Sequence, residues 1–247
     1  MFCVYGQWGF GADLWLVSIS KIAYNPSMKT HLEPTFVENF KTAYTSLYNL
    51  HPQVEEEDFR FRYLRVDWFF PNHINNLLKE ILKVGGKYYT DIDYQVCLFA
   101  GLFHDAGLVY KRESADALGH ENRSVEYAQN ELHKIGYETD FIEKVSECIK
   151  ATEPDYISEL PEALLVRNAD AYAHIISMHF FGKANFTADI HKFIKWFDEK
   201  LETTYIKVSI PELKKEIEPL VKSYKLMIAN YKENRGELDF FSDFFVD

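Results

Sequence analysis

Hydrophobic residues repeat with the period of an α-helix along most of this chain, and few stretches alternate with the period of a β-strand. Each apolar stripe places side chains three or four residues apart, as on the buried face of a helix. The stripes are Phe36/Val37/Phe40/Ala43/Tyr44/Leu47, Ile74/Leu77/Leu78/Ile81/Leu82, Val125/Ala128/Leu132/Ile135, Phe141/Ile142/Val145/Cys148/Ile149, Ile190/Phe193/Ile194/Phe197/Leu201 and Leu213/Ile217/Leu220/Val221/Tyr224/Met227/Tyr231. The pattern predicts an all-α helical bundle.

Proline and glycine punctuate these helices. Pro71 suits the first turn of a helix, and Gly85–Gly86 is expected to end the helix that begins there. Gly136 is expected to end the helix of the Val125 stripe, and a further helix is predicted to enter after Pro161. The elements are therefore separated by short connections, as in a helical bundle.

The chain is expected to form one domain, residues 31–247, whose C-terminal helices pack on a central core. Residues 1–30 are an apolar arm that glycines and Asp13 interrupt. The arm has no basic start, which makes a signal peptide an unlikely interpretation, and its role stays open. The tail 236–247 mixes acids with four phenylalanines. Docking on its own domain is the simpler expectation for this tail, and a homodimer contact is the alternative.

Charge and cysteine content narrow the classes of partner and compartment. The formal net charge of -11 argues against general nucleic-acid binding. Phe59–Arg65 alternates aromatic and basic residues, but the acidic run Glu55–Asp58 precedes it and favours a solvated strip. The three cysteines, Cys3, Cys97 and Cys148, are too widely spaced for a disulfide framework and fit the reducing cytoplasm. No apolar run reaches the roughly 20 residues that span a bilayer, so no membrane partner is expected.

The dipeptide His104-Asp105 is the most informative feature of the sequence. It closes the apolar run Tyr94–Gly107, which is predicted to be a buried helix. An imidazole and a carboxylate are costly in such a place unless something satisfies them. A divalent metal ion does so, because it takes a neutral imidazole nitrogen and a carboxylate oxygen as ligands.

Two further residues complete a familiar order of ligands. His73 lies near the start of one predicted helix, and Asp170 lies in the segment Val166–His174 of another. The order His, His-Asp and a distant Asp resembles the HD-domain metal-dependent phosphohydrolases. Ala169–Tyr172 is similar to the Ala-Asp-x-Leu-like segment of that family, with Tyr in place of Leu. The resemblance runs from about residue 69 to about 174 and implies an HD-domain-like fold.

The resemblance also implies a cofactor and its ligands. These are a divalent transition metal (manganese, iron, nickel, cobalt or zinc) and the side chains of His73, His104, Asp105 and Asp170. Family members with two metals carry additional histidines between the His-Asp pair and the final Asp. This chain has none in Ile149–Tyr156, where Asp155 stands roughly at the expected place. Either Asp155 substitutes as an oxygen ligand or the site holds one metal, and one metal is the favoured interpretation.

Other polar residues follow the ligands closely. The resemblance implies that Asp105 orients water as well as binding metal, and Glu121 is the candidate for assisting proton transfer. The alternative is that His120 and Glu121 only cap a helix. Four residues are candidates for contacting substrate, three of them as cations for phosphate and His174 as a neighbour of Asp170 on one helix face. They are Lys111, Arg112, Arg123 and His174.

The leading functional hypothesis is a metal-dependent phosphohydrolase that acts on a small phosphate ester, with a nucleotide as one candidate. The alternative is a catalytically silent HD module that binds a nucleotide or a partner protein. Metal-dependent oxygenation ranks below both, because the extra histidine ligands are missing from the sequence. Nucleotide binding without turnover, across several added metals, would favour the silent module.

Overall fold

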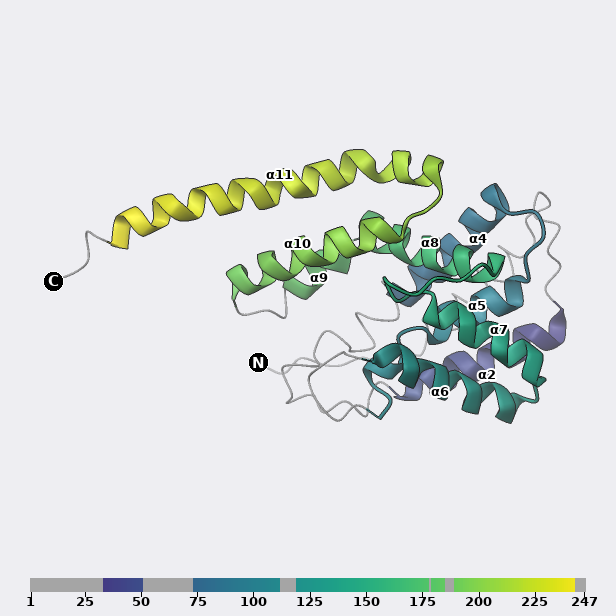
Figure 1. Ribbon diagram of the computed structural model, residues 1–247. Helices are drawn as coiled ribbons and strands as arrows, with labels where there is room; N and C mark the ends of the chain where they lie inside the picture. The colour runs from purple at the N-terminus through teal and green to yellow at the C-terminus, as the bar shows by residue number, and fades with distance from the viewer. Residues whose placement is uncertain (1–32, 51–72, 112–118, 178, 185–188, 243–247) are drawn as a thin grey trace, which may run out of the picture.

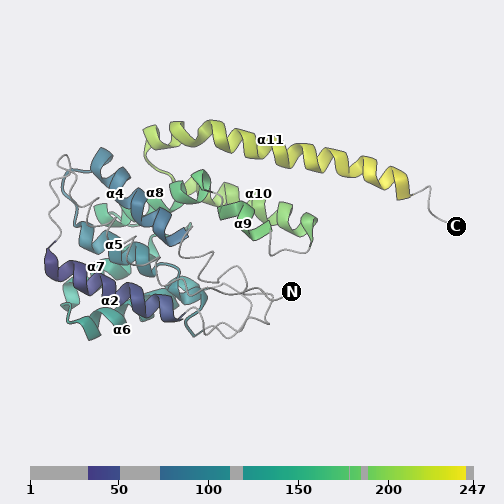
Figure 2. The same ribbon diagram turned by 180° about the vertical axis from the view of Figure 1, so that it is seen from behind.

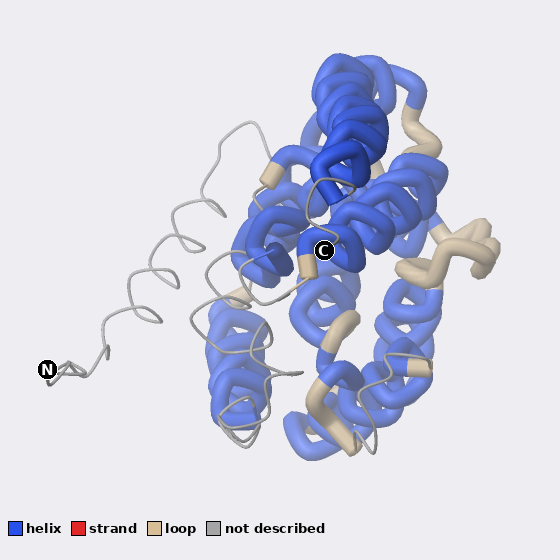
Figure 3. The backbone as a smooth tube through the Cα atoms, turned by 90° about the vertical axis from the view of Figure 1, so that its left-hand side faces the viewer, coloured by secondary structure: helices blue, strands red, loops and turns tan. Residues whose placement is uncertain are grey.

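The computed structural model describes residues 33–50, 73–111, 119–177, 179–184 and 189–242. Every regular element within these ranges is a helix, which confirms the predicted all-α fold for this part of the chain (Figure 3). The predicted N-terminal arm, the aromatic and basic strip 59–65 and the cation Arg112 lie outside the described residues.

The helices surround one apolar helix, α5, whose residues are buried except for Gln95. Asp93 caps its first turn, because the carboxylate accepts from the backbone N–H groups of Gln95 and Val96. Helices α2, α4, α7 and α8 pack against α5, and α10 and α11 pack on α8 (Figures 1 and 2). The elements are α2 (Pro34–Leu50), α4 (Asn75–Tyr88), α5 (Tyr94–Phe103), the 3₁₀ turn η4 (Ala106–Leu108), α6 (His120–Ile135), α7 (Thr139–Lys150), α8 (Pro161–Ile176), α9 (His179–Ala184), α10 (Ile190–Lys207) and α11 (Pro211–Ser242).

Helix α4 passes through Gly85–Gly86 and ends at Tyr88, so the predicted stop at these glycines is wrong. Gly85 instead provides room for a neighbour. A Cβ atom there would lie 2.7 Å from ring atoms of Tyr94 and 3.0 Å from Leu165. The glycine thus allows α4 to approach α5 and α8 closely, which a pattern of local turn residues does not reveal.

Helix α6 ends as the sequence predicts. Gly136 has a φ of 95° in the left-handed region, and its N–H donates to the carbonyls of Leu132 and His133. The N–H of Tyr137 also donates to Leu132, which completes a capped C-terminus. The turn fixes the direction in which the chain leaves α6 for α7.

Helix α11 is the longest described element, and its C-terminal end extends beyond the other helices (Figure 1). Its buried face includes Tyr224 and Ile228, whereas Met227 is 52% exposed. The predicted stripe was therefore wrong at Met227, where the buried residue is its neighbour Ile228. Among the described helices, neither α11 nor any other combines the length and the apolar character needed to cross a bilayer.

Candidate metal centre

Two buried histidines face each other at the centre of the bundle. His73 occupies the turn that precedes α4, and His104 follows the last residue of α5. Their Nε2 atoms are 3.0 Å apart. The Nδ1 atom of His104 lies 2.9 Å from the carbonyl oxygen of Gly101. Because a carbonyl only accepts, Nδ1 carries the proton in neutral His104, and its Nε2 lone pair faces His73.

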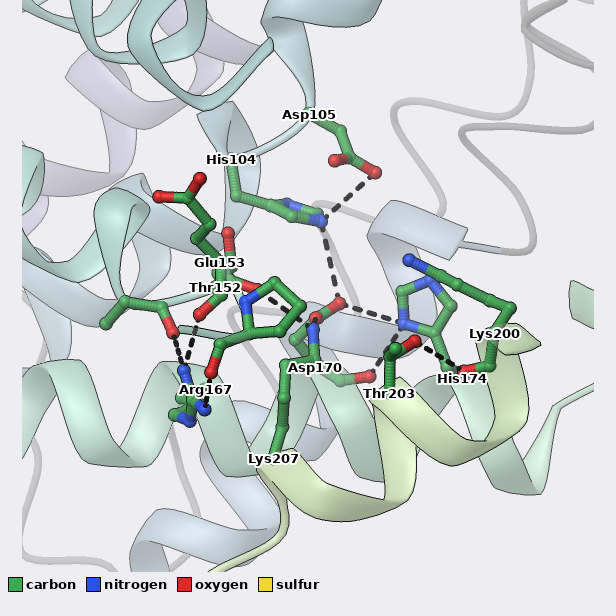
Figure 4. Close-up of polar contacts among 12 residues, drawn as sticks. His104, Asp105, Thr152, Glu153, Arg167, Asp170, His174, Lys200, Thr203 and Lys207 are labelled. Atoms are coloured by element: carbon green, nitrogen blue, oxygen red, sulfur yellow. Dashed lines mark hydrogen bonds and ion pairs between the residues drawn. The ribbon is translucent and has the colours of Figure 1, made fainter. Parts of the chain in front are cut away.

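Two aspartates complete this group. One oxygen of Asp105, Oδ2, lies 3.2 Å from the Nε2 atoms of both His73 and His104. Asp170 reaches the group from α8, with Oδ1 at 3.6 Å from His104 Nε2 and 3.9 Å from His73 Nε2. Figure 4 shows His104, Asp105 and Asp170 converging from different elements. The structure thus brings together all four residues that the sequence proposed as metal ligands.

The donor atoms suit a divalent transition metal. Ligands about 2.1 Å from one ion lie about 3.0 to 3.4 Å from one another in common geometries, close to the spacings in this group. Asp170 Oδ1 is buried and accepts no hydrogen bond among the described residues. Two imidazoles with two carboxylates form a nitrogen and oxygen donor set that manganese, iron, cobalt, nickel and zinc accept. His73, His104 and Asp170 are close enough to hold an ion together.

The charges within the group depend on one another. Burial opposes protonation of His104, but Asp105, Asp170 and the carbonyl of Gly101 together outweigh burial and raise the pKa of His104 to about 9. Burial likewise opposes ionisation of Asp105, yet His104 and the neighbouring imidazoles hold its pKa well below the usual range. For His73, burial and then His174 lower the pKa to about 4. The metal-free group therefore keeps Asp105 negative and His73 neutral at neutral pH.

A buried lysine holds the other oxygen of Asp170. The Nζ atom of Lys207, at the end of α10, lies 2.6 Å from Asp170 Oδ2 and donates to the carbonyl of Thr152 at 3.0 Å. Burial opposes the negative charge of Asp170, but the ammonium of Lys207 holds the pKa of this carboxyl well below its usual range. Sequence reasoning missed Lys207, because 37 residues separate it from Asp170.

Asp155, in the turn after α7, is not placed to bind a metal ion at the centre. Asp155 is exposed. The guanidinium of Arg167 binds carbonyl oxygens of this turn, including those of Ala151 and Pro154 (Figure 4). Asp155 is therefore placed at the surface, away from the buried group, and its interpretation as a substitute metal ligand is not supported. The single-metal interpretation stays a prediction.

His120 and Glu121 lie beside Asp105 at the start of α6. The Nε2 atom of His120 is 3.2 Å from Asp105 Oδ1, and its Nδ1 atom is 3.2 Å from Glu121 Oε2. The imidazole therefore stands between the two carboxylates. Gly107 makes this approach possible, since a Cβ there would lie 2.0 Å from the carbonyl oxygen of His120. Glu121 reaches the group through His120.

The cations that the sequence proposed for phosphate have other neighbours. Lys111 is exposed and forms an ion pair with Glu126 of α6. The Nε atom of Arg123 donates to the carbonyl of Gly107 at 2.9 Å. Neither contact places its cation among the four metal-ligand candidates.

His174 does lie at the group, as the sequence proposed. Its Nδ1 atom is 2.9 Å from the backbone oxygen of Asp170 and 3.0 Å from Asp170 Oδ1. The ring also packs near His73 and His179, with centroid separations of 4.4 and 4.3 Å. These three histidines form a second set with metal-ligand spacing, and it shares His73 with the first set. His179 follows the matched segment and carried no signal in the sequence.

A comparison with protein families agrees with this geometry. The family model of the HD domain matches residues 73–175. The chain is similar to the HD domain over this segment. The match begins at His73 and includes His104, Asp105 and Asp170, so it covers the whole proposed ligand set of the HD domain. No curated protein and no solved structure matches the chain.

Proposed function

We propose that this HD-domain protein is a metal-dependent phosphohydrolase that acts on a small phosphate ester. One observation carries the proposal: His73, His104, Asp105 and Asp170 converge at a buried point with the spacing of metal ligands. The HD domain supports the same class of chemistry. A nucleotide is one candidate substrate.

When bound, a divalent transition ion supplies a Lewis acid for phosphoryl oxygen and makes water a better nucleophile near neutral pH. His73, His104, Asp105 and Asp170 would hold this ion. The remaining steps belong to the protein. Asp105 accepts a hydrogen bond from water through its carboxylate and so orients the attacking oxygen. This role uses the carboxylate as an anion, the state in which the neighbouring imidazoles hold it.

His120 is the proposed group for proton transfer. It contacts Asp105 through Nε2 and Glu121 through Nδ1, both at 3.2 Å. Glu121 would fix the proton of His120 on Nδ1, which leaves Nε2 to exchange a proton on the side of Asp105. Glu121 thus acts through His120, which refines the direct role that the sequence suggested for it.

The first test measures metal and activity together. Protein purified without added metal or chelator is compared with Asp105→Ala and with Asp155→Ala, which changes an exposed carboxylate outside the group. We expect metal in the wild type and in Asp155→Ala, and little metal in Asp105→Ala. Hydrolysis of a panel of phosphate esters should follow the metal content. Full metal and full activity in Asp105→Ala would refute the proposal.

The silent binding module remains the competing proposal, and the same panel separates it from the enzyme. A silent module would bind nucleotide without turnover when manganese, nickel or cobalt is added. Nucleotide binding is measured by calorimetry and turnover by released phosphate. Turnover that depends on added metal would reject the silent module.

A further inference from the structure

Helix α10 lies along α8 and presents two lysines, Lys200 and Lys207, to the metal-centre side of the molecule (Figure 4). They are seven residues apart, which is two turns, so they lie on one face of the helix and about 10 Å apart along its axis. Lys207 is fixed opposite Asp170 at 2.6 Å. Figure 4 shows Lys200 extending past the ring of His174, one turn after Asp170 on α8. The two helices therefore run in opposite directions at this contact.

The two lysines differ in their partners. The ammonium of Lys207 is buried and satisfied by Asp170 and by the carbonyl of Thr152. Lys200 is half-buried. Within the ranges that the structure describes, its ammonium makes no hydrogen bond or ion pair. A cation held partly out of water without a counter-ion is unfavourable, and an anion bound beside it would remove that cost.

We propose that Lys200 binds the phosphoryl group of the substrate beside the metal centre. The inference rests on the proposed phosphohydrolase function and adds a specific phosphate contact to it. It assigns to α10 the role that the sequence gave to Lys111, Arg112 and Arg123. A phosphate monoester has two negative charges at neutral pH, so it can satisfy a metal ion on one side and an ammonium on the other.

The electrostatic surroundings of Lys200 support this position. Burial, followed by the like charge of Lys207, lowers the pKa of Lys200, and Asp170, Asp105 and Glu121 oppose that shift. Lys200 is therefore near the carboxylates of the centre while it pairs with none of them. Its ammonium also acts on His179, whose pKa is lowered by burial, by His174 and His73, and by Lys200.

The set His73, His174 and His179 offers a competing interpretation, in which a second metal ion binds there. The two lysines of α10 argue against it. Lys207 already neutralises one oxygen of Asp170, and Lys200 would repel a further cation at the neighbouring histidines. An anion at this side of the centre is attracted by the same charges.

The test uses the full chain loaded with manganese and measures binding of inorganic phosphate by calorimetry. Lys200→Met should weaken phosphate binding by about tenfold or more, whereas Lys200→Arg should restore most of it. Lys195→Met, which removes an exposed lysine from the same helix, should bind phosphate like the wild type. Metal content should stay at one ion per chain in all four proteins.

Each contrary result has a separate meaning. Phosphate affinity that is unchanged in Lys200→Met would overturn the role of Lys200, while metal-dependent hydrolysis would leave the proposed function intact. Two ions in the wild type, with one lost in His179→Gln, would replace the phosphate contact by a second metal site. A wild type that binds neither metal nor phosphate would reject the proposed function itself.

Discussion

The two aspartates of the centre have different neighbours. Among the described residues, the carboxylate of Asp105 contacts imidazoles: His73 and His104 at one oxygen and His120 at the other, each at 3.2 Å. Asp170 instead has a permanent cation, because Lys207 lies 2.6 Å from its Oδ2 atom. Asp105 is thus surrounded by imidazoles, and Asp170 is held by a permanent ammonium charge.

This difference suggests a division of labour between the two carboxylates. Asp170 offers a single oxygen, Oδ1, to a metal ion, and its geometry is set by the contact between α8 and α10. Asp105 lies on the short turn between α5 and η4, beside the start of α6. Its neighbour His120 is the proposed group for proton transfer. Asp105 is therefore expected to determine activity, and Asp170 is expected to contribute more to stability.

The largest expected effect is the loss of phosphohydrolase activity when Asp105 is replaced. Asp105→Asn keeps the size of the side chain but removes the charge that binds metal and orients water. We expect phosphohydrolase activity to fall by about 10³-fold or more, with a smaller loss in the free energy of unfolding than Lys207→Met causes. Initial rates at saturating metal and urea denaturation test both statements. Activity near that of the wild type would contradict the expectation that Asp105 determines activity.

The next effect is the loss of stability when the ion pair between Lys207 and Asp170 is broken. Lys207→Met leaves the buried carboxylate of Asp170 without its cation and should lower the free energy of unfolding of the metal-free protein by about 3 to 5 kcal/mol. Asp170→Asn should cost a similar amount, because it leaves the ammonium unpaired. The double variant should recover part of the loss. Strictly additive losses, measured by urea denaturation without metal, would contradict a coupled pair.

Substitution of Gly107 tests the contact between His120 and Asp105 without changing either residue. Gly107→Ala would place a methyl group 2.0 Å from the carbonyl oxygen of His120 and should displace the start of α6. We expect a stability loss of about 1 to 3 kcal/mol together with a fall in activity of about tenfold or more. Gly85→Ala is the matched control, because its methyl group would clash with Tyr94 and not with a residue of the metal centre. It should lower stability with little change in the rate per folded molecule.

The last effect grows with pH and concerns the core that carries both aspartates. Burial raises the pKa of Tyr44 and of Tyr127 to about 12, and it raises the pKa of Cys97 and Cys148 well above the usual value. The unfolded chain loses these protons first, near pH 8.5 for cysteine and pH 10 for tyrosine. Stability should therefore fall as the pH rises above about 8.5, by up to about 1.4 kcal/mol per pH unit for each ionising group.

Urea denaturation at pH 7 to 11 measures this loss. Tyr44→Phe is expected to flatten the decline above about pH 10, because it removes one of the ionising groups. A stability that rises through this range would contradict the buried state of these side chains. Asp105 and Asp170 stay ionised throughout, whereas His104, whose pKa in the metal-free protein is about 9, loses its proton in this range and adds to the decline.

Sequence alone predicted much of the fold and one side of the centre. The apolar stripes of α4 and α7 follow the helical period closely, so their buried faces were correct: Leu77, Leu78 and Ile81 in α4, and Val145 and Ile149 in α7, are all buried. The predictions for Gly85 and Met227 were wrong, because tertiary contacts and not the local pattern determine the surroundings of these residues. Gly85 lies inside its helix, where it leaves room for Tyr94, and Met227 is exposed although the helical period predicted it to be buried.

The sequence by itself determined the four metal-ligand candidates, since His104-Asp105 is a local pair in an apolar helix and His73 and Asp170 complete a recognisable order. Tertiary structure decided which cations accompany them. Lys207 and Lys200 belong to α10, outside the matched segment, and only the packing of α10 on α8 brings them to the centre. From sequence alone, a lysine on a helix is expected to be solvated. Its charge becomes informative only when folding removes water from around it and fixes its distance to a carboxylate.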